Sequence, residues 1–414
     1  MTHDEPHDRR WQAVAFLFAA FALCYVDRQA VFSIYPVLQK ELGFSGAQLG
    51  LVGSLFVWSY ALTMPLAGRL ADSFRRDRLL ILSLVLWSIG TLGTALSRSV
   101  TMFLGWRVMM GLTESLYFPA AMAILATLHP GPTRSRALSI HQCAQLLGIV
   151  AGGWYGGWAA DQIGWRNGFA ALCIIGLGYS LVLLFFFRRV SLNRTAARPI
   201  SEGSRHLLHS PLYLLLAATF FCFCGVLWIV YAWLPDLLYE RFKLSLSTSG
   251  FDATLYIQAG CGVGTVLGGW LADRLAVRVR AARFYTVGCG VLLSMPCVYL
   301  AFRASTIGEF KVFATGFGLL SGLAIGNWFA AAYDVVRDQD YGFATGLLNM
   351  TGGVSAGIAM LAAGVYKSSL GLAGIMAWAS VFAALAGIAL LIGARSGIGL
   401  RKIPHPGAAG QNPA

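Results

Sequence analysis

Two residues of opposite charge stand side by side in an otherwise apolar stretch of the sequence. The run "ALCYVDRQAVFSIYP" at 22–36 contains Asp27 and Arg28, and a later apolar run contains Arg107 and Glu114. A charged side chain at the middle of a membrane-spanning helix costs about 2.5–3.5 kcal/mol on insertion scales. A carboxylate can exchange a proton and an arginine can hold a carboxylate in a forked contact, so the four residues indicate a site for protons and an organic anion.

Helical geometry decides which of these charges can meet. Arg107, Gly111 and Glu114 are spaced i, i+4, i+7 and share one helix face, with the glycine leaving room for another group. Asp27 projects about 100° away from Arg28, so the two neighbours cannot readily pair. We therefore expect Arg28 to find its counter-ion on another helix, above all Glu114, or on a ligand.

Protonation of Glu114 would release Arg28 to bind a substrate carboxylate. The alternative is a charge cluster that only locks two helices together, although buried ion pairs stabilise less well than apolar packing. Of 18 carboxylates and 31 basic residues, we expect only these four to lie deep within helices. Further along the same helix, Pro119 cannot donate to the carbonyl of Ser115 and should loosen the helix just beyond Glu114.

The elements that must hold these residues are predicted to be membrane-spanning helices. The chain is 57% hydrophobic and 12% charged, too little charge to cover a soluble protein of 414 residues. Apolar blocks long enough to cross a bilayer recur throughout. We predict twelve of them, at 11–40, 47–71, 79–97, 101–128, 138–160, 168–187, 211–235, 249–272, 284–302, 311–333, 343–366 and 371–394.

The net charge of +13 is explained by topology. Arginines cluster at 9–10, 69–78, 188–205 and 274–283, which fall on one side of a twelve-span arrangement. This positive-inside pattern predicts a multi-pass protein of the cell's inner (plasma) membrane with both termini cytoplasmic, and it argues against nucleic acid as a partner. The eight cysteines lie in apolar blocks without histidine partners, so we expect packing roles and neither a metal site nor a cofactor.

The chain is predicted to consist of two similar halves. The polar, basic segment at 188–210 separates a six-helix half at 1–187 from another at 211–394, followed by a cytoplasmic tail at 395–414. The second block ends in "AGRLAD" and the eighth in "GGWLAD", at matching places in each half. The fold class expected is an all-α membrane protein of two pseudo-symmetric six-helix halves, with a site between them near mid-membrane.

These features resemble the major facilitator superfamily of transporters over essentially the whole chain. "GRLADSFRR" at 68–76 is similar to the family's signature between helices 2 and 3, although Ser73 and Arg75 depart from it. The second-half copy at 269–274 keeps the Asp-Arg pair. The resemblance implies an inner gate in which the aspartate caps a helix of the opposite half, formed here by Asp72, Arg76, Asp273 and Arg274.

Within that superfamily, the chain resembles the anion:cation symporters, which include bacterial sugar-acid/proton symporters and vesicular anion carriers. The similarity rests on "YVDR" at 25–28, "RVMMGLTESLYFP" at 107–119 and "WLPDLL" at 233–238. It implies that Arg28 binds the substrate carboxylate and that Asp27 and Glu114 are protonatable. It further implies that Arg107 tunes Glu114 and that hydroxyl groups bind to Tyr25, Tyr60 and Gln145.

The second half should supply the other wall of the site. "GNWFAAAYD" contains Asn327 and Trp328, and "LLNMTGG" contains Asn349. Amides bond to hydroxyls and an indole stacks on a carbon face, which suits a sugar acid. Interior packing of Trp328 and interhelical bonding of Asn349 explain the same residues equally well. Tyr231 and Gln258 are further candidates.

The expected function is proton-coupled symport of a small organic anion such as a sugar acid or another carboxylate, by a protein that works as a monomer. An alternative is a spinster-like transporter of lysolipids or amphipathic compounds, which "DRQ" at 27–29 and "LGFSGAQLGL" at 42–51 favour. A sensor that binds without transport is a third possibility, which the gate motifs oppose. An enzyme is not expected, because no nucleophile–base set or phosphate-binding loop occurs.

Overall fold

The structure, a computed structural model, describes residues 7–129, 133–190, 210–336 and 341–396, and this part of the chain contains helices and no strand. The helices are α1 (His7–Ser33), α2 (Tyr35–Leu42), α3 (Gly46–Ser73), α4 (Arg76–Ala95), α5 (Val100–Glu114), α6 (Tyr117–Leu128), α7 (Arg134–Gln162), α8 (Trp165–Phe187), α9 (Pro211–Phe242), α10 (Leu246–Ala276), α11 (Ala282–Arg303), α12 (Ile307–Ile325), α13 (Trp328–Tyr333) and α14 (Tyr341–Ser396).

Each predicted apolar block corresponds to a helical segment, and the predicted all-α fold is confirmed. Three blocks consist of two helices in sequence: α1 with α2, α5 with α6, and α12 with α13. The last two blocks form α14, which is kinked at Gly371, where φ is 66°. Ten helices of the described chain are long and apolar enough to cross a membrane, and the more polar α7 is not among them.

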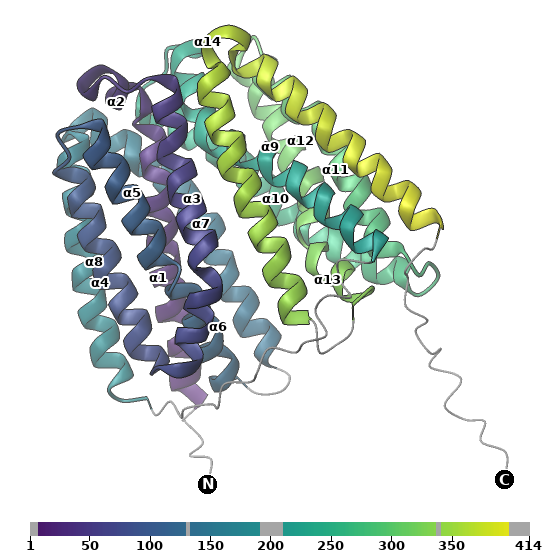
Figure 1. Ribbon diagram of the computed structural model, residues 1–414, viewed down its shortest axis with the longest axis horizontal. Coiled ribbons are helices and arrows are strands. Elements are labelled where there is room, and N and C mark those ends of the chain that lie inside the picture. The colour runs from purple at the N-terminus through teal and green to yellow at the C-terminus, as the bar shows by residue number, and fades with distance from the viewer. Residues whose placement is uncertain (1–6, 130–132, 191–209, 337–340, 397–414) are drawn as a thin grey trace.

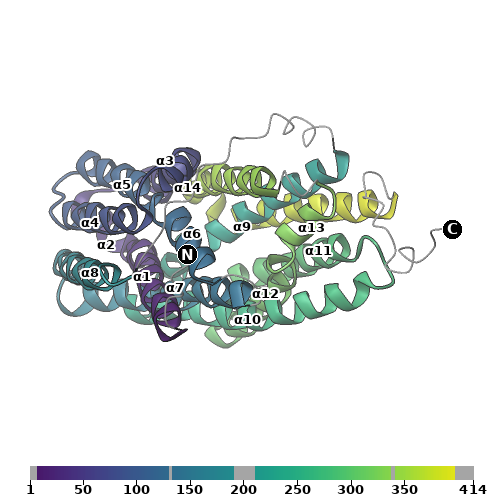
Figure 2. The same cartoon turned by 90° about the horizontal axis from the view of Figure 1, so that it is seen from below.

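The helices pack in two bundles, α1–α8 and α9–α14 (Figure 1). α1 and α9 lie near the centre of the molecule, whereas α4 and α8 lie at the outer edge of the first bundle (Figure 2). The predicted linker at 188–210 and tail at 395–414 fall almost wholly outside the described residues. The predicted domain boundaries therefore stay a prediction.

In the described part of the chain, the contacts between the bundles run from one end of the molecule to about the middle of the helices. We call the end where α1 begins and α14 finishes the terminal face, and the other end the opposite face. Near the opposite face, glycines bring helices of the two bundles into backbone contact: Gly46 meets Gly364, and Gly153 meets Gly250. The Ser33 hydroxyl adds a hydrogen bond to the carbonyl of Gly153, at 2.7 Å. The opposite face is therefore closed.

Toward the terminal face the bundles diverge (Figure 1). Along the pair formed by α3 and α14, contacts extend as far as Ala61 and Gly353. Beyond that level, a Cβ built on Gly68 or Gly346 meets no atom of the described chain within 4 Å. The structure is thus open at the terminal face and closed at the opposite face, which is one end state of a two-bundle transporter.

Closure of the opposite face is expected to depend on Gly157 of α7. A Cβ at this position would collide with the backbone of Leu246 and Ser247 on α10. Overpacking in Gly157→Ala should cost the closed state about 1–3 kcal/mol, which shifts the population toward opening by about 5- to 150-fold. Spin labels at the exposed Gln162 and Lys243 would report the distance in a background without native cysteines.

The matched control is Gly178→Ala, since Gly178 lies in α8 and has no atom within 4 Å of an added Cβ. We expect a longer mean distance between the two labels in Gly157→Ala only. An unchanged distance distribution in that variant would contradict the role of the glycine contact in closure.

Candidate functional site

A buried ion pair joins α1 to α5 at the centre of the first bundle. Arg28 Nη2 donates to Glu114 Oε2 at 2.7 Å, and the two side chains are 7% and 1% exposed. Glu114 is the last residue of α5, and the helix is interrupted before α6 begins at Tyr117, as the missing donor of Pro119 predicts. The prediction that Arg28 finds its counter-ion on Glu114 is confirmed.

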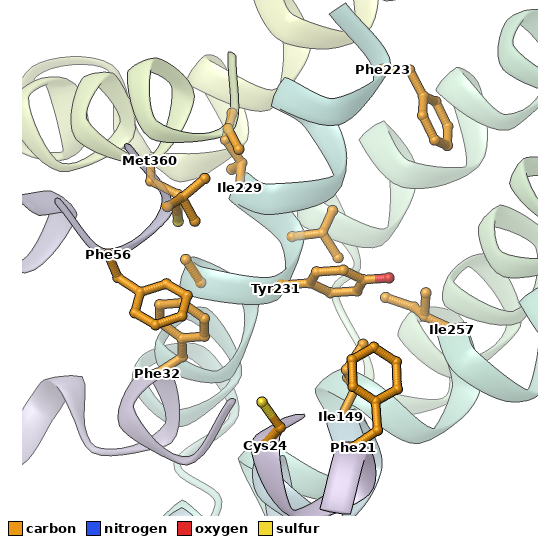
Figure 3. Close-up of a cluster of buried hydrophobic side chains, with 14 of the residues drawn as sticks. Phe21, Cys24, Phe32, Phe56, Ile149, Phe223, Ile229, Tyr231, Ile257 and Met360 are labelled. Atoms are coloured by element: carbon orange, nitrogen blue, oxygen red, sulfur yellow. The ribbon is translucent and has the colours of Figure 1, made fainter. Parts of the chain in front are cut away.

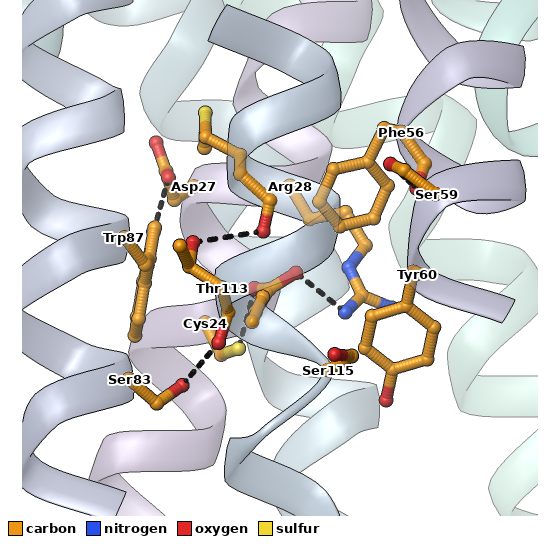
Figure 4. A network of polar contacts seen from close by, with 12 residues as sticks. Cys24, Asp27, Arg28, Phe56, Ser59, Tyr60, Ser83, Trp87, Thr113 and Ser115 are labelled. Carbon is orange, nitrogen blue, oxygen red and sulfur yellow. Dashed lines mark hydrogen bonds and ion pairs between the residues drawn. The ribbon is translucent and has the colours of Figure 1, made fainter. Parts of the chain in front are cut away.

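Aromatic rings surround the guanidinium group of Arg28. Its Cζ lies 4.6 Å from the ring centroid of Tyr25. It lies 4.8 Å from that of Phe56 and 4.9 Å from that of Tyr60 (Figure 4). Stacking of this kind contributes about 0.5–2 kcal/mol per desolvated contact. Among the described residues only one carboxylate, that of Glu114, pairs with Arg28, and Nε has no hydrogen-bond partner. Arg28 therefore retains donor capacity for a second anion.

Glu114 has a second partner that the sequence did not single out. The Cys24 thiol donates to Glu114 Oε1 at 2.5 Å. Cys24 precedes Arg28 by four residues, so both side chains lie on the face of α1 that meets α5. That spacing was the available signal, but the prediction assigned all cysteines to packing. The two oxygens of Glu114 are thus held by one cation and one weak donor.

Asp27 lies on another side of α1, away from Arg28, as its position on the helix predicts. Its Oδ2 accepts a hydrogen bond from Trp87 Nε1 at 2.5 Å (Figure 4). It also accepts one from Thr91 Oγ1 at 2.7 Å, and both donors lie on α4. Oδ1 is buried without a partner. Trp87 and Thr91 were not predicted, because nothing in the sequence says that α4 lies beside α1.

Arg107 is fully buried and does not contact Glu114 directly. Its Nε donates to the carbonyl of Val52 at 3.1 Å, and its Cζ lies 4.7 Å from the ring centroid of Phe56. No carboxylate oxygen of the described residues lies within 4.0 Å of it. Phe56 therefore contacts both guanidinium groups, so any effect of Arg107 on Glu114 acts over a longer range.

Gly111 is the small residue between Arg107 and Glu114. A side chain there would collide with Ser59 Oγ and the carbonyl of Phe56 on α3. This glycine was expected to leave room for another group, and in the structure the backbone of α3 occupies that space. The close approach brings Phe56 and Tyr60 to Arg28.

The other predicted first-half residues lie beside this network. Tyr25 and Tyr60 are half-buried and line the guanidinium of Arg28. Gln145 is half-buried on α7, one turn before Gly148, whose backbone packs directly on Tyr25. The fold thus brings these three polar side chains to the same region of the first bundle.

On the second bundle, two of the residues that were predicted to line the substrate site are buried. Asn327 is 3% exposed and donates through Nδ2 to the carbonyl of Leu323 at 2.9 Å, within its own helical segment. Trp328 is 2% exposed, and its ring centroid lies 5.0 Å from that of Phe220. The burial favours interior packing for both residues in this conformation. Asn349 is exposed on α14.

Tyr231 and Gln258 form the polar surface of the second bundle that faces α1. Gln258 Nε2 donates to the Tyr231 hydroxyl at 3.0 Å. Gln29 of α1 donates to the Tyr231 carbonyl at 3.0 Å, which links the two bundles. Tyr231 lies in the apolar cluster where the bundles meet, together with Phe21, Phe56 and Met360 (Figure 3).

The contacts recorded for Arg76, Asp273 and Arg274 lie within their own bundles. Asp273 is exposed and pairs with Arg283 at 3.3 Å, within its own bundle. Arg283 also pairs with Asp334 at 2.6 Å. Arg274 stacks on Trp270, and Arg76 donates to Thr127. The side chain of Asp72 lies outside the part of the chain that the structure describes.

The prediction that only four charges lie deep within helices is wrong. Asp236 is 1% exposed because α9 runs on to Phe242, beyond the predicted end at residue 235. It pairs with Lys367 of α14 at 2.5 Å. Asp252 of α10 is 4% exposed and pairs with Lys311 at 3.4 Å. These pairs lie near the opposite face and do not touch Arg28.

The described residues contain no group of three or more His, Cys, Asp or Glu side chains that could hold a metal ion. The side chains gathered at the centre are two carboxylates, two guanidinium groups, a thiol, phenols and amides. Such a set can exchange protons and bind an anion.

Comparison with known proteins places these observations in a family. The sequence profile described as "Major Facilitator Superfamily" matches residues 17–360. The chain is 28% identical to a "probable sulfoacetate transporter" of Cupriavidus necator over 72% of this chain and 74% of that protein. It is 26% identical to a "probable galactarate/D-glucarate transporter" of Escherichia coli over 92% and 93% of the two chains.

Solved structures agree on the fold. A bacterial homologue of the human lysosomal transporter Spinster, crystallised in an inward-facing and unoccupied conformation, superimposes with a TM-score of 0.83. The match covers 95% of this chain and 98% of that one at 19% identity. At this identity the likeness concerns the fold alone.

Proposed function

The chain belongs to the major facilitator superfamily, and from that premise we propose that it is a proton-coupled symporter of small organic anions. The observation that carries the proposal is the Arg28–Glu114 ion pair, buried beside aromatic rings within the first bundle. Packing alone does not account for it, because apolar residues of similar volume would be as stable or more stable there.

Glu114 and the substrate compete for Arg28 in the proposed mechanism. While Glu114 is ionised, it neutralises Arg28 and leaves little attraction for an anion. Protonation of Glu114 removes that counter-charge, and Arg28 then binds the substrate carboxylate through charge-assisted hydrogen bonds. Because proton and anion each favour binding of the other, they are transported together.

Asp27 is the second proposed proton site. Its unpartnered Oδ1 is buried beside α4, while Trp87 and Thr91 hold the other oxygen. One proton per monoanion would make transport electrically silent, whereas protonation of both Asp27 and Glu114 would make it voltage-driven. We assign Arg107 a positioning role through Phe56, on which both guanidinium groups pack.

The proposed substrate is a sugar acid or a related small carboxylate. The relatives named for galactarate, D-glucarate and D-galactonate support a hydroxylated acid. Tyr25, Tyr60 and Gln145 supply phenol and amide groups beside Arg28 for its hydroxyls. On the second bundle Asn349, Tyr231 and Gln258 are our candidates for the other end of the substrate.

Alternating access would expose this site to each side in turn. The protein is a multi-pass membrane protein of the superfamily. We infer that the terminal face is cytoplasmic, since the arginine-rich segments at 69–78 and 274–283 lie there. The structure is then the inward-open state, and closing the gate would bring Asp72 and Asp273 against the opposite bundle. We place the protein in the plasma membrane and expect the monomer to suffice.

The test is proton uptake by liposomes that contain the purified protein, with no imposed gradient. Sugar acids, simple carboxylates, sulfoacetate and lysolipids are added outside one at a time, and external pH is recorded. Symport predicts alkalinisation with one or more of the acids and no signal from empty liposomes. A response to lysolipids alone would favour the spinster-like alternative, and no response to any acid would contradict the proposal.

A further inference from the structure

A hollow separate from the central site opens at the terminal end of the first bundle. It has a volume of about 360 Å3 and lies where α4 begins and α8 ends. We call it the arginine pocket, and it is lined by Arg75, Asp77, Arg78, Ile81, Leu184, Phe187, Arg188 and Val190. Figures 1 and 2 place both helices at the outer rim of the molecule, away from the centre between the bundles.

The charge of the arginine pocket is unbalanced. Asp77 is buried, and Arg75 holds both its oxygens, at 3.3 and 2.9 Å. Arg78 and Arg188 are exposed and form no ion pair with a residue of the described chain. The Arg188 guanidinium stacks on the Phe185 ring at 5.4 Å, and no carboxylate of the described chain pairs with Arg78 or Arg188. The planar donors of these two groups match the oxygens of a phosphate group.

The other half of the lining is apolar. Phe187 and Val190 are buried, and Ile81 and Leu184 are partly buried. Further along α8, toward the middle of the membrane, Leu181 and Phe185 are 55% and 59% exposed. These side chains lie on the rim of the bundle, so the apolar surface continues from the pocket along the lipid-facing side of α8.

The pocket also lies at the level of the membrane surface. The apolar spans of α4 and α8 end at Arg76 and Phe187 respectively, which are the helix ends that form the pocket. Positive charge at the bilayer surface above an exposed apolar strip complements a molecule with an anionic head and a hydrocarbon tail. A free inorganic anion would use the arginines and leave the apolar strip unused.

We propose that the arginine pocket binds one anionic phospholipid of the surrounding leaflet. Its phosphate group lies between Arg78 and Arg188, and one acyl chain follows Leu184, Leu181 and Phe185 along α8. The site is independent of the Arg28–Glu114 pair, and its occupancy does not depend on the transported substrate. Occupancy of the arginine pocket therefore depends on how much anionic phospholipid the surrounding leaflet contains.

The test measures lipid binding to the purified full-length protein by native mass spectrometry. Phosphatidylglycerol and phosphatidylcholine with the same acyl chains are titrated separately. The variant Arg78→Gln/Arg188→Gln removes the two unpaired charges, and Arg278→Gln/Arg280→Gln is the matched control, with the same charge change at exposed positions of the other bundle. Thermal unfolding verifies that both variants fold.

We expect the wild type to prefer phosphatidylglycerol and the pocket variant to lose about tenfold or more in affinity for it, the effect of losing charge-assisted contacts. The control should stay within about twofold. Equal binding of both lipids, or equal loss in both variants, would overturn the proposal.

The variant Leu184→Gln distinguishes binding of a phospholipid from binding of a free phosphate ion. This change should weaken phosphatidylglycerol binding and leave inorganic phosphate binding unaltered. If phosphate binds to the pocket as tightly as the lipid does, and Leu184→Gln has no effect on either, the pocket is a simple anion site and the lipid proposal fails.

Discussion

Arg28→Ala is expected to abolish binding of the transported anion. In the proposed complex, two charge-assisted hydrogen bonds connect Arg28 to the substrate carboxylate, and their loss should cost about 3 kcal/mol or more. This corresponds to at least about a hundredfold in Kd. Isothermal titration or the shift of the melting temperature by substrate would measure it, once the liposome assay has identified an acid.

Loss of binding alone would not distinguish a damaged fold from a lost contact. Arg28→Ala leaves Glu114 buried without its counter-ion, and breaking a buried pair costs about 3–5 kcal/mol. The double variant Arg28→Ala/Glu114→Gln removes both charges together. We expect it to recover thermal stability while still failing to bind.

Arg28→Lys provides a second comparison. Lysine keeps the charge but loses the planar fork and the stacking on Tyr25, Phe56 and Tyr60. We expect intermediate affinity in this variant. Affinity equal to the wild type in Arg28→Ala would refute the proposed carboxylate contact.

The second large effect is expected from Glu114→Gln. Glutamine has the shape of the protonated acid and no charge, so Arg28 is permanently available to the substrate. The variant should still exchange labelled for unlabelled substrate across a liposome membrane. It should lose accumulation of substrate in response to a pH gradient, because residue 114 no longer takes up a proton with it.

The size of the pH gradient sets how far the substrate can accumulate. One pH unit is worth about 1.36 kcal/mol per coupled proton and supports about tenfold accumulation. In Glu114→Gln the accumulation ratio should fall to about one if this proton is the only one coupled. Residual accumulation that Asp27→Asn then removes would assign the remainder to Asp27.

A matched control is Glu41→Gln at the opposite face. Glu41 accepts from Trp165 at 2.9 Å and pairs with Arg166 at 2.6 Å, and these contacts hold the pKa of its carboxyl below the usual value. It is distant from Arg28 and should affect neither exchange nor accumulation. Intact accumulation in Glu114→Gln would rule out its coupling role.

Several features of the site were accessible from the sequence because they depend on one helix at a time. Neighbouring positions on a helix point about 100° apart, so Asp27 and Arg28 had to find different partners. Only a few charged residues lie within apolar runs, so Glu114 was the main candidate for the counter-ion of Arg28. Pro119 indicated the break between α5 and α6 in the same way, through a hydrogen bond that proline cannot make.

Other features depend on which helices become neighbours. Trp87 and Thr91 hold Asp27 because α4 packs near α1, and Phe56 reaches two arginines because Gly111 admits the backbone of α3. The sequence left cavity lining and interior packing equally open for Trp328, and in the structure Phe220 of α9 packs against it. Each contact joins residues far apart in the chain, and no local pattern specifies them.

The sequence by itself determined the number and order of the apolar helices, the presence of charges among them and the resemblance to a transporter family. Hydrophobic runs of bilayer length and the cost of burying charge are local properties, so they can be read along the chain. Only the tertiary structure decided that the opposite face is closed, that Asn327 and Trp328 are turned inward, and that Arg78 and Arg188 line one pocket. These outcomes depend on how side chains of separate helices fit together, and this fit exists only after the helices have packed.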